Sequence, residues 1–344
     1  MAGFGNNRVA QGVHDDLYAR CVAMSAGARP LVICEADLIG LFVDDTDRIR
    51  AEIRKSTPDA DVVIASTHVH EGPDTMGQWG PGRGVPGIND AYMAFLHERI
   101  GATALSAVKS MKPADIRLAV VKSKELDAFI DDDRPPITHD SSLILMRLTD
   151  ASGTPIANVV NWANHPETLG SKNTQITADY PYYLCSKLEK ELGGVAALWN
   201  GAVGGMQSTL GSKVTDPADG KEAADGTFRK AELIGNRVAE LAAAALKTGE
   251  RVTVDRIVFR ETRVAIPMTN PNFQAAAKAN AFKGRKIPNA DGATTAPVGF
   301  VRLSRSGRAV LEIALIPGEM YPELSTGAVE RYAEADYPDA PIEP

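Results

Sequence analysis

Two histidines two positions apart follow a short apolar stretch early in the chain. Residues 60–67 have the sequence ADVVIAST, which is typical of a buried strand, and His68 and His70 come directly after it. Side chains alternate between the two faces of an extended segment, so both imidazoles are expected to point the same way. They could bind one metal ion together, divide into a ligand and a proton-handling partner, or belong to an ordinary polar loop.

A third histidine and a glutamate stand at similar places further along the chain. The apolar stretch 156–162 leads to His165, and the end of a predicted hairpin over 298–319 leads to Glu319. Two imidazoles and one carboxylate, with a fourth position left for water, form the ligand set of hydrolytic zinc enzymes. The sequence therefore predicts a zinc ion bound by His68, His165 and Glu319.

A glycine-rich segment follows another predicted strand, 195–200. Gly201, Gly204 and Gly205 in this segment leave backbone N–H groups uncovered, which suits either an oxyanion site or a tight turn. The Gly-Lys-Ser/Thr ending of a phosphate-binding loop is missing. We therefore expect no nucleotide at this position.

The elements that would position these residues alternate between apolar strands and amphipathic helices. Strands are predicted over 17–26, 29–41, 60–67, 116–126, 141–150, 155–165, 195–200 and 251–268, helices over 44–56, 89–111, 179–192 and 227–248, and a loop over 269–297. This order predicts an α/β fold of mixed β-sheets flanked by helices, with residues 1–344 in one domain.

Composition excludes two classes of partner. The formal net charge is −7, and binding to nucleic acid needs a surplus of Lys and Arg that this sequence lacks. No stretch approaches the roughly 20 apolar residues that a membrane-spanning helix needs. We expect neither a nucleic-acid-binding protein nor an integral membrane protein.

The three cysteines are too few and too scattered for a thiolate zinc site. We expect Cys21, Cys34 and Cys185 to be small buried apolar residues, although a bridge between the first two stays possible in an oxidising compartment. The residues after Met1, AGFGNNRVAQG, lack the basic flank and apolar centre of a signal peptide. No signal peptide is expected in this chain.

Several collinear motifs together resemble one enzyme family. The segments GVHDDLYARC, EADLIGL, STHVHEGPD, DDRPPITHDSSLILMRL, NWANHPETLG, ITADYPYYL, NGAVGG and IPGEM resemble the N-terminal catalytic domain of the neutral/alkaline non-lysosomal ceramidases. That family uses one zinc ion to hydrolyse the amide of N-acyl sphingoid bases. The resemblance implies a lipid or N-acyl amide substrate, a possible peripheral contact with membranes, and export to the periplasm or the extracellular space.

The resemblance also implies roles for individual residues. His68, His165 and Glu319 match the zinc ligands, and His70 matches the histidine that helps to move the proton. By the same resemblance, Arg134 would hold the substrate or the oxyanion. The backbone amides of Gly204 and Gly205 would donate hydrogen bonds to the oxyanion.

Two motifs depart from the family pattern. Where the family has a serine that takes part in catalysis, this chain has Gln207, with Ser208 one place later, so the serine role is open. Glu71 replaces the serine that usually follows the histidine pair. The true substrate is therefore the least certain part of the resemblance, and a hydrolase of another small amide or ester, or a silent binding protein, stays a rival.

The ends of the chain differ as well. The family's first strand and its zinc-binding tyrosine have no match, and neither has its C-terminal immunoglobulin-like domain; the sequence is either truncated at both ends or that of a shorter relative. Tyr321, Tyr332 and Tyr337 are candidates for a fourth ligand, although none matches the motif.

Overall fold

The computed structural model describes residues 1–344 except 28, 83, 133–136, 280–281, 283–291 and 327–344. Its longer helices are α1 (Val43–Ser56), α2 (Asp90–Lys109), α4 (Tyr180–Leu192) and α5 (Phe228–Thr248), and shorter ones are α3 (Lys124–Asp127), α6 (Pro271–Lys278) and α7 (Pro322–Thr326). The strands are β1 (Gly12–Val13), β2 (Ala19–Met24), β3 (Leu31–Ala36), β4 (Asp61–Ser66), β5 (Ala114–Lys122), β6 (Ser142–Asp150), β7 (Pro155–Trp162), β8 (Gln175–Ile176), β9 (Val195–Asn200), β10 (Glu250–Val252), β11 (Arg256–Pro267), β12 (Ala293–Arg305) and β13 (Arg308–Leu315).

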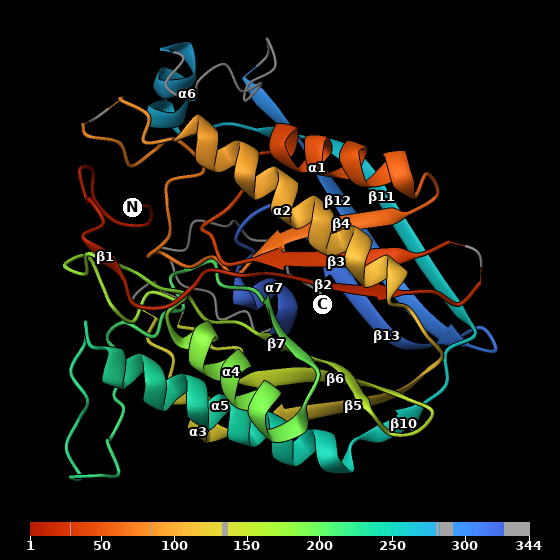
Figure 1. Ribbon diagram of the computed structural model, residues 1–344. Coiled ribbons are helices and arrows are strands. Elements are labelled where there is room, and N and C mark those ends of the chain that lie inside the picture. The colour runs from red at the N-terminus through yellow and green to blue at the C-terminus, as the bar shows by residue number, and fades with distance from the viewer. Residues whose placement is uncertain (28, 83, 133–136, 280–281, 283–291, 327–344) are drawn as a thin grey trace.

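Two mixed sheets form the centre of the molecule, with helices on their outer faces (Figure 1). The first has the order β2-β3-β4, in which β3 and β4 are parallel, and α1 and α2 pack on one of its faces. The second has the order β10-β5-β6-β7-β9, in which β7 and β9 are parallel, and α4 and α5 cover one face. The predicted α/β architecture of mixed sheets with flanking helices is confirmed.

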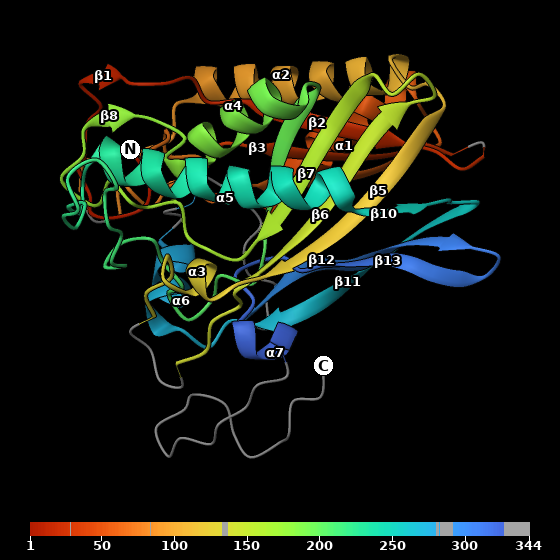
Figure 2. The ribbon, with the colours of Figure 1, turned by 90° about the horizontal axis from the view of Figure 1, so that it is seen from below.

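A third sheet, of order β11-β12-β13, packs against the other two (Figure 2). One apolar cluster joins all three, with Ile33 from the first sheet, Val159 from the second, and Val301 and Leu303 from the third. The three sheets therefore share a core, which fixes the positions of the loops that leave their strands. The short strands β1 and β8 form a separate parallel pair.

Local sequence explains the elements nearest the site. All six residues of β3, LVICEA, are buried, as expected for a central strand with apolar contacts on both faces. α5 begins at a capping residue, Thr227, whose side chain accepts a hydrogen bond from the Lys230 backbone N–H. Its Ala- and Leu-rich sequence buries one face against the second sheet.

Among the described residues, no helix has the length and apolar character needed to cross a membrane.

Two of the predicted elements differ from the structure. The single strand predicted over 251–268 is divided into β10 and β11, which belong to different sheets. The predicted loop 269–297 contains α6, whose first turn has Asn270 as cap and Pro271 at the position where a missing N–H costs nothing. Local capping chemistry therefore starts a helix inside a stretch that otherwise has the composition of a loop.

Cys21 and Cys34 form a disulfide, so the expectation that both are simply buried apolar residues is wrong. They stand directly opposite each other on the antiparallel strands β2 and β3, with their Cα atoms 4.0 Å apart. The possible bridge considered from the sequence is therefore the one present. Cys185 is free and buried, as predicted.

A pair of glycines offers a test of how closely α4 and α5 pack. A Cβ added at Gly235 in α5 would lie 2.4 Å from the Tyr180 carbonyl oxygen, whereas a Cβ at Gly101 in α2 would meet nothing within 4 Å. Gly235→Ala is expected to lower the free energy of unfolding by about 2 kcal/mol, because the backbone of α4 at Tyr180 must move away from the added methyl group. Gly101→Ala should raise it by about 0.5 kcal/mol. Urea denaturation measures both, and equal effects would contradict this packing.

Candidate metal centre

The loop after β4 holds His68 in a fixed orientation. Its backbone has φ +70°, in the left-handed region that residues other than glycine seldom occupy. The His68 backbone N–H donates to the Leu38 carbonyl at 3.1 Å, and its ring Nδ1 lies 2.6 Å from the Ile39 carbonyl oxygen. Because Nδ1 must be the donor in that contact, the lone pair of His68 is on Nε2.

His165 has the same arrangement in the loop after β7. The Gln207 carbonyl accepts from its backbone N–H at 2.8 Å and from its ring Nδ1 at 2.8 Å. The side chain is almost fully buried. With Nδ1 engaged in this contact, Nε2 of His165, like that of His68, is the ring nitrogen that remains to face a metal ion.

Glu319, from the loop after β13, places its carboxylate between these two rings. Its Oε1 lies 3.1 Å from His68 Nε2 and its Oε2 lies 3.4 Å from His165 Nε2. Burial favours the protonated acid, but the contacts with His165 and His68 outweigh it and hold the pKa of Glu319 well below its ordinary range. The three predicted ligands, one from each sheet, do converge.

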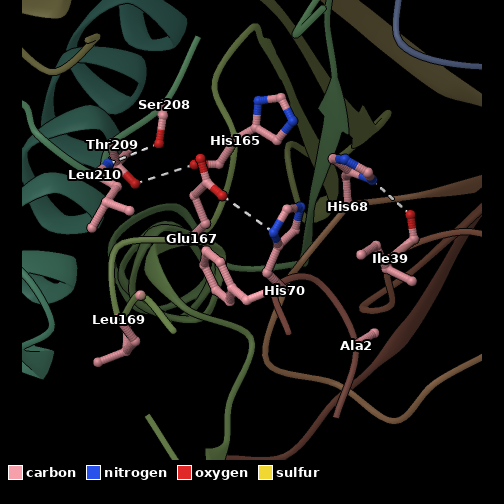
Figure 3. A network of polar contacts seen from close by, with 12 residues as sticks. Ala2, Ile39, His68, His70, His165, Glu167, Leu169, Ser208, Thr209 and Leu210 are labelled. Carbon is pink, nitrogen blue, oxygen red and sulfur yellow. Dashed lines mark hydrogen bonds and ion pairs between the residues drawn. The ribbon is translucent and has the colours of Figure 1, made fainter. Parts of the chain in front are cut away.

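His70 completes a group of three imidazoles around the same point (Figure 3). The ring centroids of His68, His70 and His165 are 4.9 to 5.5 Å apart, and one ring nitrogen from each lies within 4.8 Å of the others. Burial lowers the pKa of His70 to about 4, so its ring is neutral at physiological pH. Its Nε2 is buried and has no hydrogen-bond partner among the described residues.

The arrangement fits a transition-metal ion. Three imidazoles, of which two contact backbone carbonyls through Nδ1, surround one point, and an ionised carboxylate lies beside two of them. Metal-binding histidines usually make such a contact through the ring nitrogen that does not bind the metal. The three histidines thus form a group that can hold a metal ion.

Sequence reasoning missed Glu167, which stands two residues after His165. Its Oε2 lies 3.2 Å from His70 Nδ1, and its side chain is 4% exposed. A dashed line marks this contact in Figure 3. Burial raises the pKa of Glu167, but the hydrogen bond with His70, the nearby rings and the Ser208 hydroxyl together lower it to about 2. The only signal in the sequence was a carboxylate in the loop that carries a predicted ligand.

The glycine-rich segment is used differently from the prediction. Gln207 is fully buried: its Oε1 accepts from the Asp140 N–H and its Nε2 donates to the Ala202 carbonyl, so it does not stand in for the serine of the resembling family. The Gly204 N–H donates to the Met320 carbonyl at 2.9 Å. Since this amide is already paired, the predicted oxyanion role does not fit Gly204; that of Gly205 stays a prediction.

Three other predicted site residues, Arg134, Tyr332 and Tyr337, lie outside the described residues. Tyr321 follows Glu319 by two positions, and its role as a fourth ligand stays a prediction.

The fold belongs to the α/β class represented by ceramidases. Superposed on a ceramidase solved as a complex with C2, the protein covers 88% of its own length at a TM-score of 0.69 and 14% sequence identity. On neutral ceramidase from Pseudomonas aeruginosa it covers 88% at a TM-score of 0.65 and 16% identity. The resemblance predicted from the sequence motifs is confirmed at the level of the fold.

The likeness is one of structure and covers part of those proteins. The chain spans about three fifths of the length of the two ceramidases, 59% and 58%. No protein-family model matches this sequence, and no curated protein matches it either.

Proposed function

We propose that the protein is a zinc-dependent amidohydrolase that cleaves the amide bond of N-acyl sphingoid bases or similar lipids. The observation that carries the proposal is the approach of the Glu319 carboxylate to the Nε2 atoms of His68 and His165, at 3.1 and 3.4 Å, beside the group of three histidines that can hold a metal ion. The likeness of the fold to ceramidases supports the reaction class and the type of substrate.

The ion would be held by His68 Nε2, His165 Nε2 and the Glu319 carboxylate. Zn²⁺ is commonly bound by such a mixture of imidazole and carboxylate ligands. The contacts of both Nδ1 atoms with backbone carbonyls orient the two rings and so favour metal binding through Nε2. When bound, zinc would lower the pKa of a water molecule and polarise the scissile carbonyl.

His70 would handle the proton. Its neutral ring offers a free Nε2 beside the proposed ligands, in position to accept a proton from water and to return it to the leaving amine. The Gly205 N–H, one residue beyond the amide that is paired with Met320, would donate to the oxyanion. Arg134 is a further candidate for that role only by resemblance.

Three exposed apolar side chains are sequence neighbours of the proposed site residues and are candidates for contact with an acyl chain. Ile316 and Leu324 lie on either side of Glu319 in the sequence and are 44% and 41% exposed, and Met206, next to Gly205, is 49% exposed. Peripheral contact with a membrane that contains the substrate is proposed from the resemblance to ceramidases.

One observation favours a second candidate, a zinc hydrolase acting on another amide or ester. Gln207 occupies the place of the family's catalytic serine with both ends of its side chain bonded internally. A substrate that does not need a serine in that position would suit this site equally well.

Metal analysis combined with a substrate panel tests the proposal. Purified protein should contain about one zinc per chain, and a chelator should remove activity that added zinc restores. A panel of fluorescent N-acyl sphingoid bases, short-chain amides and esters then identifies the substrate class. Protein that binds no zinc and hydrolyses none of these compounds would overturn the proposal, whereas activity confined to short amides or esters would select the second candidate.

We also propose that the protein works in an oxidising compartment outside the cytoplasm. The disulfide between Cys21 and Cys34 supports this location, because such bonds persist mainly in oxidising surroundings. Protein isolated without reductant should titrate, after denaturation, for one free thiol, that of Cys185, and for three after reduction. Three free thiols in protein taken directly from its native compartment would contradict the proposal.

A further inference from the structure

The ring of His70 lies between two different environments. Neither ring nitrogen makes a well-aligned hydrogen bond among the described residues: Nε2 faces the candidate metal centre, and Nδ1 lies 3.2 Å from Glu167 Oε2, within ion-pair distance. Glu167 is not among the residues that the sequence motifs mark for chemistry. Figure 3 shows this carboxylate beside the ring of His70, which raises the question of what it does there.

The backbone of His70 is fixed independently of its ring. The His70 N–H donates to the Pro166 carbonyl at 3.2 Å, and the Arg8 guanidinium donates to the His70 carbonyl. Gly3 packs so closely that a Cβ there would lie 2.6 Å from His70 Cγ. These contacts hold the segment in place, and the identity of the protonated ring nitrogen depends on what faces Nδ1.

Glu167 lies beside the loop after β9 and is restrained through its own backbone. The Ser208 hydroxyl of that loop, whose Oγ accepts from the Leu210 N–H at 2.9 Å, helps to lower the pKa of Glu167. The Glu167 backbone N–H donates to the His165 carbonyl at 3.1 Å, which ties it to the loop of a proposed ligand. The carboxylate is therefore buried, oriented and directed at one nitrogen.

We propose that Glu167 is a positioning residue that acts through His70, an inference that rests on the proposed hydrolytic function. The carboxylate accepts the Nδ1 proton of His70, which fixes the ring tautomer and leaves the lone pair on Nε2, directed at the metal centre. The same relationship between carboxylate and imidazole orients the base in other hydrolases.

The pair accounts for the proton in the proposed reaction. Water loses a proton to His70 Nε2 as its oxygen bonds to the carbonyl carbon, and the imidazolium that forms lies beside the Glu167 carboxylate. When the C–N bond breaks, this proton passes from Nε2 to the amine nitrogen, and a carboxylic acid and an amine leave. Because Gln207 is engaged on both sides, no side chain at the family's serine position shares this task.

Two variants of Glu167 and one control test the inference. Glu167→Ala removes the acceptor, and Glu167→Gln keeps the volume should the alanine variant fold poorly. Glu35→Gln is the control because Glu35 is an equally buried carboxyl group, on β3, and has no histidine contact in the described structure. Steady-state kinetics, zinc content and nitrogen-15 NMR of histidine-labelled, metal-free protein are measured for each.

For both Glu167 variants, kcat should fall about 100-fold with KM within about threefold of the original value and with zinc content unchanged. In metal-free Glu167→Ala, the His70 resonances should show a loss of the Nδ1-protonated tautomer, whereas Glu167→Gln keeps an acceptor oxygen for that proton and loses only the charge beside the imidazolium. The control should match the unmodified protein in all three measurements. An unchanged His70 tautomer in Glu167→Ala, or a kcat within threefold of the original in both variants, would overturn the inference.

The two proposals fail in distinguishable ways. Absence of zinc and of hydrolysis in the unmodified protein would remove the proposed function, whereas the NMR measurement needs neither. A His70 tautomer that depends on Glu167 would then still establish the positioning contact.

Discussion

Replacing His68 by alanine should abolish zinc binding and reduce hydrolysis about 1,000-fold or more while the fold persists. The substitution removes one imidazole ligand and leaves the Glu319 carboxylate with a single ring partner, His165. The core is untouched, because the His68 side chain is 18% exposed at the end of β4. Elemental analysis measures bound zinc, hydrolysis assays measure kcat/KM, and circular dichroism checks the fold.

His14→Ala is the matched control for this prediction. The His14 ring stacks on Phe228, with centroids 3.6 Å apart, and has no contact with the three central imidazoles. It should retain zinc and activity. If His68→Ala keeps a full complement of zinc, the ligand assignment is wrong, and if it keeps activity without zinc, metal-dependent hydrolysis is wrong.

Glu319→Gln should weaken zinc binding at least 100-fold near pH 7 and reduce hydrolysis by a similar or larger factor. The substitution keeps the size of the side chain and removes its charge, which lies within 3.4 Å of both imidazoles. In the metal-free protein, burial lowers the pKa of His165, and contact with Glu319 and the charge of Glu167 raise it above its ordinary value. Loss of the Glu319 charge should therefore lower the pKa of His165.

Competition with a chromophoric chelator measures the zinc affinity of Glu319→Gln, and histidine NMR titration of metal-free protein measures the pKa. Glu312→Gln is the control, since Glu312 is on the adjacent strand β13 and pairs with Arg302 at 2.6 Å, outside the centre. Equal zinc affinity in Glu319→Gln and in this control would show that the carboxylate is not a ligand.

The sequence predicted the main elements because their patterns agree with their burial. β3 and β4 of the first sheet, and β7 and β9 of the second, are short apolar stretches that contribute buried residues to the core. Sites in α/β folds commonly lie just beyond the carboxyl ends of buried strands, which is why polar residues after β4 and after β7 were credible site residues although the two strands belong to different sheets. The prediction of His68 and His165 follows from that rule.

Other features depend on contacts between distant segments, which no local pattern encodes. The contact between Glu167 and His70 exists only because the loops after β7 and β4, from two different sheets, approach each other. Pairing of Gly204 with Met320 likewise needs the third sheet in place. The Cys21–Cys34 bridge required the exact register of β2 against β3.

The three proposed ligands lie in loops that follow strands of three different sheets, so an ion bound among them would cross-link the three sheets. It would bind only after the sheets have docked, and unfolding of any one sheet would release it. Occupancy at 100 times the dissociation constant would add about 2.7 kcal/mol to the folded state. Where zinc is scarce, proteases would encounter opened chains more often, and the lifetime of the protein would follow the supply of the metal.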